Sequence, residues 1–390
     1  MSQPENLAVV LCGPGDLKLE KCPVPEPCSG EVLLKMHSVG ICASDIHYWQ
    51  HGRIGEFVMK KPMVLGHEGA GTVIKLGSGV QNLKVGDRVS IEPGVPRENC
   101  EFCKTGRYNL SPTIFFCATP PDDGNLCRYY VHNANYCYKL PECVSFEEGA
   151  LIEPLSVAIH ACRRGGVNVS HKVLIFGAGP IGLMNLLVAK SMGACPIAVC
   201  DLIQERLDMA KCLGASAIFK VEKNSCPREL AQKVKNALCG MPDITIECTG
   251  ADQSVQTAVC ATKPGGVLVL VGMGSSSINT PMLTAITREL DIRGVFRYCN
   301  TWPTAINMVA SQRVDVKPLI THRLPLEQAA EAFELVKKGA ALKVIMLCEE
   351  QQKQQEGKTL EQCRQQCQQL LLQCQQQCQQ LKDQCETGRS

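Results

Sequence analysis

The stretch "HKVLIFGAGPIGLMNLLVAKSMGACPIAVCD" (residues 171–201) decides the fold. An apolar run, "KVLIF", leads into a glycine-rich turn, an apolar segment of helical length and a second apolar run that ends at Asp201. This order of strand, turn, helix and strand is typical of parallel, nucleotide-binding sheets. The apolar runs at 243–248 and 265–274 predict further buried parallel strands. We therefore predict a doubly wound α/β domain of the Rossmann type.

The glycine turn itself, Gly177-Ala-Gly179-Pro-Ile-Gly182, has the spacing that a dinucleotide requires. Gly177 makes the tight turn, Gly179 lets the backbone approach a pyrophosphate, and Gly182 permits close packing of helix on strand. The phosphates then meet free N–H groups at the start of the helix. The strand before the turn and the helix after it make this motif specific.

Asp201, at the end of the second strand, favours NAD over NADP. A carboxylate there bonds both ribose hydroxyls and repels a 2′-phosphate. The alternative is that Asp201 is the N-cap of the helix predicted in "IQERLDMAK", a role that it could combine with ribose binding. Arg206 weakens the preference for NAD, because a guanidinium nearby can accept a phosphate.

Outside this segment the pattern of apolar residues, Gly and Pro is different. Residues 1–150 are short β-type runs broken by Gly and Pro, which predict a β-rich domain. Helical spacing follows at 147–164. Beyond the α/β segment we predict amphipathic helices near 303–312 and 327–338 and a closing strand at 342–347.

Composition limits the classes of function. The 390 residues suffice for two domains with substantial cores. A formal net charge of +2 argues against nucleic acid or an anionic membrane as the main partner. We find no secretory signal and no run of about 18 apolar residues that would predict a membrane span. The 25 cysteines are therefore expected to be reduced thiols in a cytoplasmic protein.

Two motifs in the N-terminal half carry metal-binding side chains. "GICASDIH" (40–47) contains Cys42, and "GHEGAG" (66–71) contains His67 and Glu68. Thiolate, imidazole and carboxylate all bind zinc, and catalytic zinc uses three such ligands and keeps one position open. Separately, the three could be a core thiol, a core histidine and a surface acid. Beside a dinucleotide motif in the same chain, they favour a catalytic zinc site.

At these motifs the sequence resembles the zinc-dependent medium-chain alcohol dehydrogenases, and most closely their polyol-oxidising members. The matching patterns are GHExxGxxxxxGxxV, GICxSDxH and GxGxxG, together with long specific stretches such as "FCATPPDDGNL" (116–126) and "GVFRYCNTWP" (294–303). The resemblance implies a GroES-like catalytic domain and a Rossmann NAD-binding domain. Their expected extents are 1–155 with 298–348 for the first and 156–297 for the second.

The resemblance also implies roles for individual residues. Cys42, His67 and Glu68 would hold one catalytic zinc, and Ser44 and Glu153 would be catalytic. The expected substrate contacts are Tyr48, Phe116, Glu153, Arg297 and Tyr298. The expected NAD contacts beyond the three glycines are Ile181, Asp201, Arg206, Val271, Gly272, Met273, Val295, Phe296 and Arg297.

The implied activity is NAD-dependent oxidation of a sorbitol-like polyol at C2 to a fructose-like ketose. Xylitol or another polyol is the alternative substrate within the family. An alternative from a different class is a non-catalytic structural protein that acts through its tail. Members of the family commonly form homotetramers through the nucleotide-binding domain, so a homotetramer is expected here.

A second, structural zinc is present in many relatives on four cysteines, and the sequence predicts its absence here. The corresponding positions are Arg97, Cys100, Cys103 and Ser111. Arginine cannot ligate a metal, and a neutral serine hydroxyl is a poor substitute for thiolate. Cys100 and Cys103 are then packing residues or a loose opportunistic site.

The tail (349–390) lies outside the resemblance. Sixteen of its last 40 residues are Gln and five are Cys. Leu and Cys recur at spacings of three and four, which predicts an amphipathic helix that could self-associate as a coiled coil. A disordered Gln-rich extension is the alternative.

Overall fold

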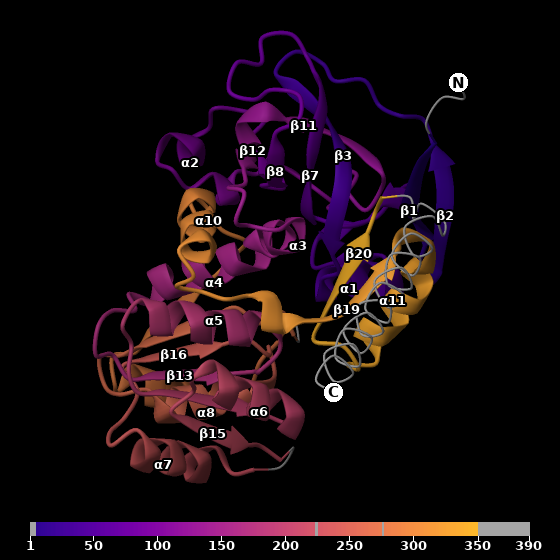
Figure 1. The fold of residues 1–390 in the computed structure, drawn as a ribbon. Helices are drawn as coiled ribbons and strands as arrows, with labels where there is room; N and C mark the ends of the chain where they lie inside the picture. The colour runs from indigo at the N-terminus through magenta and orange to yellow at the C-terminus, as the bar shows by residue number, and fades with distance from the viewer. Residues whose placement is uncertain (1–4, 223–224, 275–276, 350–390) are drawn as a thin grey trace, which may run out of the picture. The chain divides into compact units, whose positions relative to one another are not determined.

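The computed structural model describes residues 5–222, 225–274 and 277–349 (Figure 1). Within these residues two large sheets dominate, one of six strands and one of seven, and three smaller sheets accompany them. The tail prediction, helical or disordered, falls outside the described residues apart from Glu349. None of the helices in the described part of the chain combines the length and the apolar character that crossing a lipid bilayer demands.

The six-stranded sheet is parallel throughout, as predicted from the opening stretch. Its order is β15-β14-β13-β16-β17-β18, so the direction of winding reverses at β13. Ligands of such sheets bind at the carboxyl ends of the strands beside this reversal. The strands are Val173–Phe176 (β13), Ile197–Asp201 (β14), Ala217–Lys220 (β15), Ile244–Glu247 (β16), Val267–Leu270 (β17) and Asp291–Gly294 (β18).

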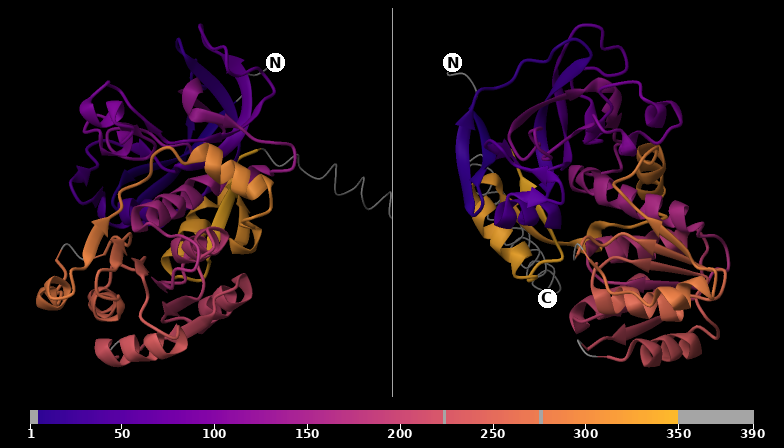
Figure 2. Two further views of the ribbon diagram at one scale, coloured as in Figure 1. Left: turned by 90° about the vertical axis from the view of Figure 1, so that its left-hand side faces the viewer. Right: turned by 180° about the vertical axis from the view of Figure 1, so that it is seen from behind.

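Helices cover both faces of this sheet (Figure 2). In β13, Val173 and Ile175 pack into one core with α4, α5 and α6, whereas Leu174 and Phe176 pack into another with α7 and α8. Because both faces are buried, the strand is a continuous apolar run. The helices are Ile152–Gly165 (α4), Pro180–Ser191 (α5), Gln204–Leu213 (α6), Pro227–Ala237 (α7), Asp252–Ala261 (α8) and Met282–Ile286 (α9).

The seven-stranded sheet has the order β12-β8-β7-β3-β20-β19, with β11 paired to β3. Its closing strands follow the parallel sheet in sequence, and Ile345 of β20 pairs with Gly40 of β3. The chain thus returns, after the parallel sheet, to the seven-stranded sheet. The members are Glu31–Gly40 (β3), Glu68–Leu76 (β7), Arg88–Ile91 (β8), Tyr129–Asn133 (β11), Cys137–Lys139 (β12), Ile320–Pro325 (β19) and Lys343–Leu347 (β20).

The other strands form the three smaller sheets, and the remaining helices lie between the strands of the seven-stranded sheet in sequence. The remaining strands are Asn6–Gly13 (β1), Asp16–Cys22 (β2), Arg53–Ile54 (β4), Phe57–Val58 (β5), Met63–Val64 (β6), Gly94–Val95 (β9) and Phe115–Phe116 (β10). The helices are Ala43–His51 (α1), Glu101–Lys104 (α2), Phe146–Ala150 (α3), Trp302–Ala310 (α10) and Ala329–Lys337 (α11).

The predicted helices were largely correct in position. The helical region expected at 147–164 is two helices, α3 and α4, and α3 begins at a capping box between Ser145 and Glu148. The helices expected near 303–312 and 327–338 are α10 and α11. Helix α1 was not predicted.

Candidate functional site

The three predicted zinc ligands lie together. One donor atom each of Cys42, His67 and Glu68 lies within 4.8 Å of the other two. Cys42 is the N-cap of α1, His67 directly precedes β7, and Glu68 is the first residue of β7. The histidine and the carboxylate are buried, whereas Cys42 is only half-buried. A metal ion held here would therefore be more accessible on the side of Cys42.

The register of two strands brings the ligands to one place. Gly40 in β3 pairs with Glu68 in β7, and Cys42 follows Gly40 by two residues. A Cβ atom on Gly40 would lie 2.0 Å from Glu68 Oε2, so any larger residue would displace the carboxylate. Glycine at position 40 therefore lets the Glu68 side chain lie across β3.

The Asp45 carboxylate contacts the ring of His67. Its Oδ1 lies 3.7 Å from His67 Nδ1, and its oxygens accept N–H bonds from Cys42 at 2.9 Å and Gly66 at 3.1 Å. Burial alone would raise the pKa of Asp45, but His67 and the two N–H groups outweigh it, so this pKa is lowered. Burial lowers the pKa of His67, and Asp45 outweighs that effect and raises it. A carboxylate that orients a ligand histidine is typical of metal sites.

Lys343 of β20 is a further member of the site that sequence analysis did not find. Its Nζ donates to both oxygens of Glu68, at 2.8 and 2.7 Å, and to the Ile41 carbonyl at 3.1 Å. The two charged side chains are only 3% and 1% exposed. Burial alone would lower the pKa of Lys343, but Glu68 outweighs it and the pKa is raised. The lysine compensates a buried negative charge and fixes the carboxylate.

This donor set fits a zinc ion. A thiolate, an imidazole and a carboxylate are the kinds of ligand that catalytic zinc takes, and three protein ligands leave its fourth position open. The Asp45 and Lys343 contacts supply the outer hydrogen bonds and ion pairs that such ligands require.

Glu153 and Tyr298 form a buried pair next to the three ligands. Glu153 lies in the first turn of α4, and its Oε1 accepts a hydrogen bond of 2.7 Å from the Tyr298 hydroxyl. Burial raises the pKa of Glu153 to about 7, with the Glu68 charge acting in the same direction. A carboxyl group with a pKa near neutral is suited to exchanging protons.

Phe116 connects the metal ligands to the predicted substrate contacts. Its ring centroid lies 6.2 Å from that of His67 and 6.5 Å from that of Tyr298. The Arg297 guanidinium lies over the same ring at 3.7 Å. Arg297 has a left-handed backbone (φ 54°), a conformation that costs energy in a non-glycine residue and often marks a functional position. Burial lowers the pKa of Arg297 to about 10, so it remains charged at neutral pH.

Helix α1 supplies the remaining predicted side chains of this group. Tyr48 is buried, which raises the pKa of its hydroxyl to about 12, and it hydrogen-bonds with Thr119. Arg297 donates to the same Thr119 hydroxyl at 3.4 Å. Ser44 is half-buried in the first turn of α1. Thr119 lies within the stretch 116–126, but the sequence alone predicted no role for it.

The glycine turn has the geometry that its motif predicts. Gly177 has a φ of +94°, and Gly179 is the N-cap of α5, which begins at Pro180. A Cβ atom on Gly182 would lie 1.7 Å from the Gly177 carbonyl oxygen, so the helix packs against the turn with no room for a side chain. Ile181, in the first turn of α5, is half-buried.

Asp201 faces this turn. Its carboxylate accepts N–H bonds from Ala178 at 2.6 Å and from Ile203 at 2.8 Å. The N-cap of α6 is Ile203, so the alternative role of Asp201 as N-cap is wrong. Arg206 is also close to the turn, since its Nη1 lies 3.9 Å from where a Cβ of Gly179 would be. The acid and the base therefore both border the predicted pyrophosphate position.

The loop after β16 depends on Glu247, which sequence analysis also missed. This carboxylate is 1% exposed and accepts N–H bonds from Thr249 at 2.8 Å and Gly250 at 2.9 Å. Its carbonyl accepts from the N–H groups of Val271 and Gly272. Glu247 thus ties two loops together beside Gly177, whose added Cβ would contact Thr249 at 3.1 Å.

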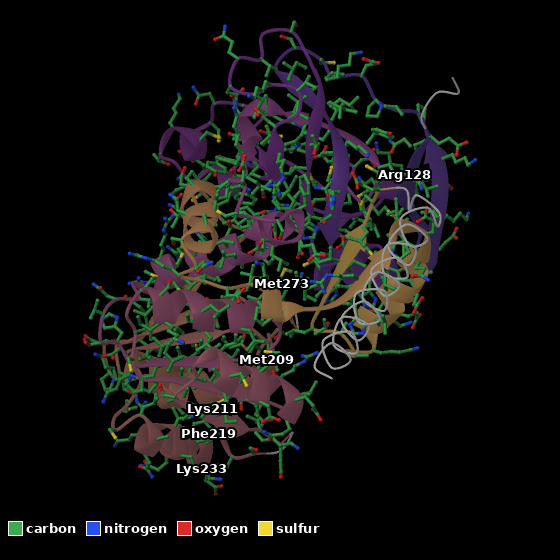
Figure 3. All side chains as sticks on the ribbon, viewed as in Figure 1. Arg128, Met209, Lys211, Phe219, Lys233 and Met273 are labelled. Carbon is green, nitrogen blue, oxygen red and sulfur yellow. The ribbon has the colours of Figure 1, made fainter. Side chains whose placement is uncertain are left out.

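The other predicted NAD contacts follow the last two strands. Met273, which is labelled in Figure 3, is 60% exposed, and this leaves its side chain available to a ligand. Val295 donates its N–H to Leu270, so the segment of Val295, Phe296 and Arg297 continues directly from β18 beside the end of β17.

The positions that correspond to a structural zinc site are only partly together. Cys100 Sγ lies 3.5 Å from Cys103 Sγ and 3.4 Å from Ser111 Oγ. Arg97 instead pairs with the Asp122 carboxylate. The position that Arg97 occupies is thus engaged in an ion pair.

Sequence profiles of two dehydrogenase domains match the chain. The alcohol dehydrogenase GroES-like domain matches residues 28–142, and the zinc-binding dehydrogenase domain matches residues 180–311. Among curated proteins, the sorbitol dehydrogenase of Bos taurus is 65% identical over 348 residues, which cover 89% of this chain and 98% of that protein. The sorbitol dehydrogenase of Homo sapiens is 64% identical over 348 residues, covering 89% and 97%.

Solved structures agree with these matches. An alcohol dehydrogenase from Escherichia coli, complexed with the cofactor NADH, superposes with a TM-score of 0.81 at 27% identity. That alignment covers 88% of this chain and 99% of the other. The predicted fold, a GroES-like domain with a Rossmann domain, is therefore confirmed. The chain belongs to the zinc-binding alcohol dehydrogenase family, in the branch that contains the sorbitol dehydrogenases.

Proposed function

We propose that the protein is a zinc- and NAD-dependent polyol 2-dehydrogenase that converts a sorbitol-like polyol into the corresponding ketose. The observation that carries this proposal is the convergence of Cys42, His67 and Glu68 beside the buried pair of Glu153 and Tyr298. The family membership supports both cofactors and the class of substrate.

Cys42, His67 and Glu68 would hold the zinc. When bound, zinc would act as a Lewis acid that lowers the pKa of water by about 9, and a similar effect on a substrate hydroxyl would favour loss of its proton by roughly 12 kcal/mol. A positioned general base alone contributes about 10²–10⁴-fold. The ligand set is therefore the largest expected contributor to the rate.

The chain's own residues then handle the proton and the orientation of substrate. Ser44, half-buried in α1, would pass the hydroxyl proton outward, and Glu153 would assist by accepting it. Tyr48, Arg297 and Tyr298 would bond the remaining hydroxyls, with Phe116 as an apolar wall. Orientation of this kind supplies a second large contribution to the rate. NAD held at the glycine turn would supply the hydride acceptor.

The NAD site would be formed by the glycine turn, Ile181, Asp201, Arg206 and the segments 271–273 and 295–297. We propose domain boundaries at residues 155 and 298, with the catalytic domain in two pieces and the Rossmann domain between them. The return of the chain, in β19 and β20, to the seven-stranded sheet supports this division.

Replacing Glu153 by Gln tests its proton role. Gln keeps the shape and can still accept the Tyr298 hydrogen bond, but it cannot take up a proton. We expect kcat to fall about 10²- to 10⁴-fold. The parent's activity should rise with pH as Glu153 loses its proton, at or below a pKa of about 7 because bound zinc favours the carboxylate. This rise should vanish in the variant. A variant that keeps the parent's pH–rate profile would contradict the role.

Replacing Asp201 by Asn tests cofactor choice. The amide keeps an acceptor oxygen but loses the charge that repels a 2′-phosphate. We expect the ratio of kcat/KM for NAD to that for NADP to fall about tenfold to a hundredfold, since hydrogen bonds to charged groups contribute about 1.5–3 kcal/mol.

Arg206→Gln in the Asp201→Asn background is the matched control. If Arg206 binds the 2′-phosphate, this double variant should lose the gained activity with NADP. An unchanged ratio in the single variant would remove Asp201 from the account of specificity.

We also propose that each chain holds one catalytic zinc and no structural zinc. The ion pair of Arg97 with Asp122 and the lack of a thiolate at position 111 support this proposal. Two thiolates alone cannot complete a tetrahedral shell.

The test of the function is NAD reduction by the zinc-loaded protein with sorbitol, xylitol and ethanol. We expect turnover with polyols and little with ethanol, because ethanol lacks the hydroxyls that Arg297 and Tyr298 would bind. The order of rates among polyols would identify the preferred substrate. Bound zinc without turnover of any polyol would instead favour a structural protein.

We further propose a cytoplasmic homotetramer. The cysteines of the described residues are all unpaired, which fits a reducing compartment. Strand β18 is an edge of the parallel sheet, and Leu283 and Ile286 of nearby α9 are 74% and 67% exposed. An open sheet edge with exposed apolar side chains beside it is a typical association surface.

The mass in solution tests this assembly. We expect four chains in the parent and fewer when Leu283 and Ile286 are both replaced by Lys, because lysine cannot be buried there without a partner. A chain ending at residue 349 is the control for the tail. If only the truncation reduces the mass, association runs through the tail and the α9 surface is excluded.

A further inference from the structure

Cys100 and Cys103 form a close pair of thiols that the proposed catalytic function does not use. Their sulfurs are 3.5 Å apart, and both side chains are half-buried, so small oxidants can reach them. A disulfide requires a sulfur–sulfur distance of about 2.05 Å, which a modest contraction of the CEFC segment would provide. Cys100 is the N-cap of α2 and Cys103 its third residue.

The surroundings of the pair divide the two thiols into different chemical roles. The Ser111 hydroxyl lies 3.4 Å from Cys100 Sγ. This hydrogen bond, with the N–H of Cys103, lowers the pKa of Cys100 to about 7. Burial and the neighbouring Cys100 raise the pKa of Cys103. Cys100 is therefore the more nucleophilic partner at neutral pH, and Cys103 remains a thiol beside it.

We propose that Cys100 and Cys103 are a redox-active dithiol that a peroxide oxidises to a disulfide, and that this oxidation weakens binding of the polyol substrate.

The reaction balances with the peroxide as the sole oxidant. The Cys100 thiolate attacks one peroxide oxygen, the O–O bond breaks, and the departing oxygen takes up a proton to leave as water or an alcohol. The Cys103 sulfur then attacks the resulting sulfenic acid and loses its proton. The S–S bond forms and a second water leaves. The two sulfurs together lose two electrons, which the O–O bond accepts.

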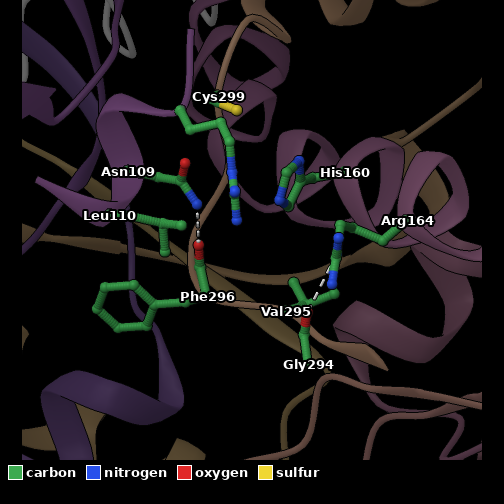
Figure 4. Close-up of a pocket in the computed structure, with 9 residues that line it drawn as sticks. Asn109, Leu110, His160, Arg164, Gly294, Val295, Phe296 and Cys299 are labelled. Carbon is green, nitrogen blue, oxygen red and sulfur yellow. Dashed lines mark hydrogen bonds between the residues drawn. The ribbon is translucent and has the colours of Figure 1, made fainter. Parts of the chain in front are cut away.

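Hydrogen bonds connect this dithiol to the substrate side of the active site. The loop after α2 contacts the segment 296–300 three times: Asn109 Nδ2 donates to the Phe296 carbonyl at 2.8 Å, Asn300 Nδ2 donates to the Gly106 carbonyl at 2.7 Å, and the Asn300 N–H donates to the Tyr108 hydroxyl at 2.8 Å. Figure 4 shows the first of these bonds.

Between its two attachment points this segment carries Arg297 and Tyr298. A cavity of about 190 Å³ adjoins it, lined by Asn109, Phe296 and Cys299 among others (Figure 4). Because these three hydrogen bonds tie the loop to the segment, and the cavity leaves open space beside it, a shift of the loop can move the segment. Contraction at Cys100 would therefore displace groups that bind substrate hydroxyls.

The experiment treats the zinc-loaded full chain with graded hydrogen peroxide. Trypsin cleaves after Arg97 and Lys104, so the peptide 98–104 contains Cys100 and Cys103 and no other cysteine. We expect this peptide to become lighter by two hydrogen atoms and to regain its mass with dithiothreitol. The KM for polyol should rise about tenfold as a displaced contact predicts, while the zinc content stays unchanged.

Cys100→Ser and Cys103→Ser should each have the parent's basal activity and no peroxide-dependent rise in KM. Cys143→Ser, which removes an exposed cysteine elsewhere, is the matched control and should respond like the parent. Oxidation of Cys42 would be distinguished by loss of zinc.

Two results would overturn the proposal: a peptide 98–104 that stays unlinked while other thiols oxidise, or a linked enzyme with an unchanged KM. The peptide mass does not depend on the enzyme's activity, so failure of the proposed function would be recognised separately.

Discussion

A Cys42→Ala protein is expected to fold but to retain no zinc and to show no measurable turnover. Three ligands are the minimum that catalytic sites use, and His67 and Glu68 alone cannot hold the ion against dilution. Without it, the roughly 12 kcal/mol that a Lewis acid contributes to loss of the hydroxyl proton is absent. Metal analysis by mass spectrometry should find one zinc per parent chain and none in the variant.

Cys143→Ala is the matched control for this substitution, because it removes an exposed thiol outside the site. It should keep both zinc and activity. NAD should still bind the Cys42→Ala protein, since the glycine turn belongs to the other large sheet. Full activity in a zinc-free Cys42→Ala protein would exclude the proposed mechanism, and two zinc ions per parent chain would exclude the single-zinc assignment.

Gly182→Ala is expected to weaken NAD binding about a hundredfold or more. The added methyl would lie 1.7 Å from the Gly177 carbonyl oxygen, a backbone atom that cannot move aside alone. Helix α5 and the turn must therefore separate, and a displacement of about 1 Å can cost a hundredfold in binding or rate. Calorimetric titration with NAD measures the effect directly.

The zinc content separates a local effect from general unfolding in this variant. Zinc should remain bound, because its proposed ligands lie at the N-cap of α1 and at the start of β7 and not on the parallel sheet. Gly13→Ala, where a Cβ would have nothing within 4 Å, is the control and should bind NAD normally. Normal NAD affinity in Gly182→Ala would show that the turn has room that the structure does not have.

Local patterns predicted most of the fold. The parallel sheet followed from "KVLIF" and its glycine turn because a strand buried on both faces must be apolar throughout. Helix α1 was missed for a physical reason: its segment, "ASDIHYWQH", is short and has no continuous apolar stripe, and its N-cap is Cys42, an uncommon cap. Packing against α11, where Trp49 meets Phe333, helps to hold it in place.

The residues of the candidate site also divide into those that a local pattern predicts and those whose role depends on distant contacts. Cys42, His67 and Glu68 could be recognised because their residue types are the chemistry of zinc ligands. Lys343 and Thr119 could not be, because a lysine and a threonine acquire their roles only from the distant residues that they contact. Glu247 was missed because its task is to hold backbone N–H groups of loops, which leaves no mark in spacing.

The ion pair between Lys343 and Glu68 joins residues 275 positions apart. During synthesis, therefore, the ribosome releases all three predicted metal ligands long before the lysine exists. The nascent N-terminal part would offer any passing cation a more negative site than the finished enzyme does. The buried charge of Glu68 is thus compensated only when β20, the last strand of the seven-stranded sheet, is in place.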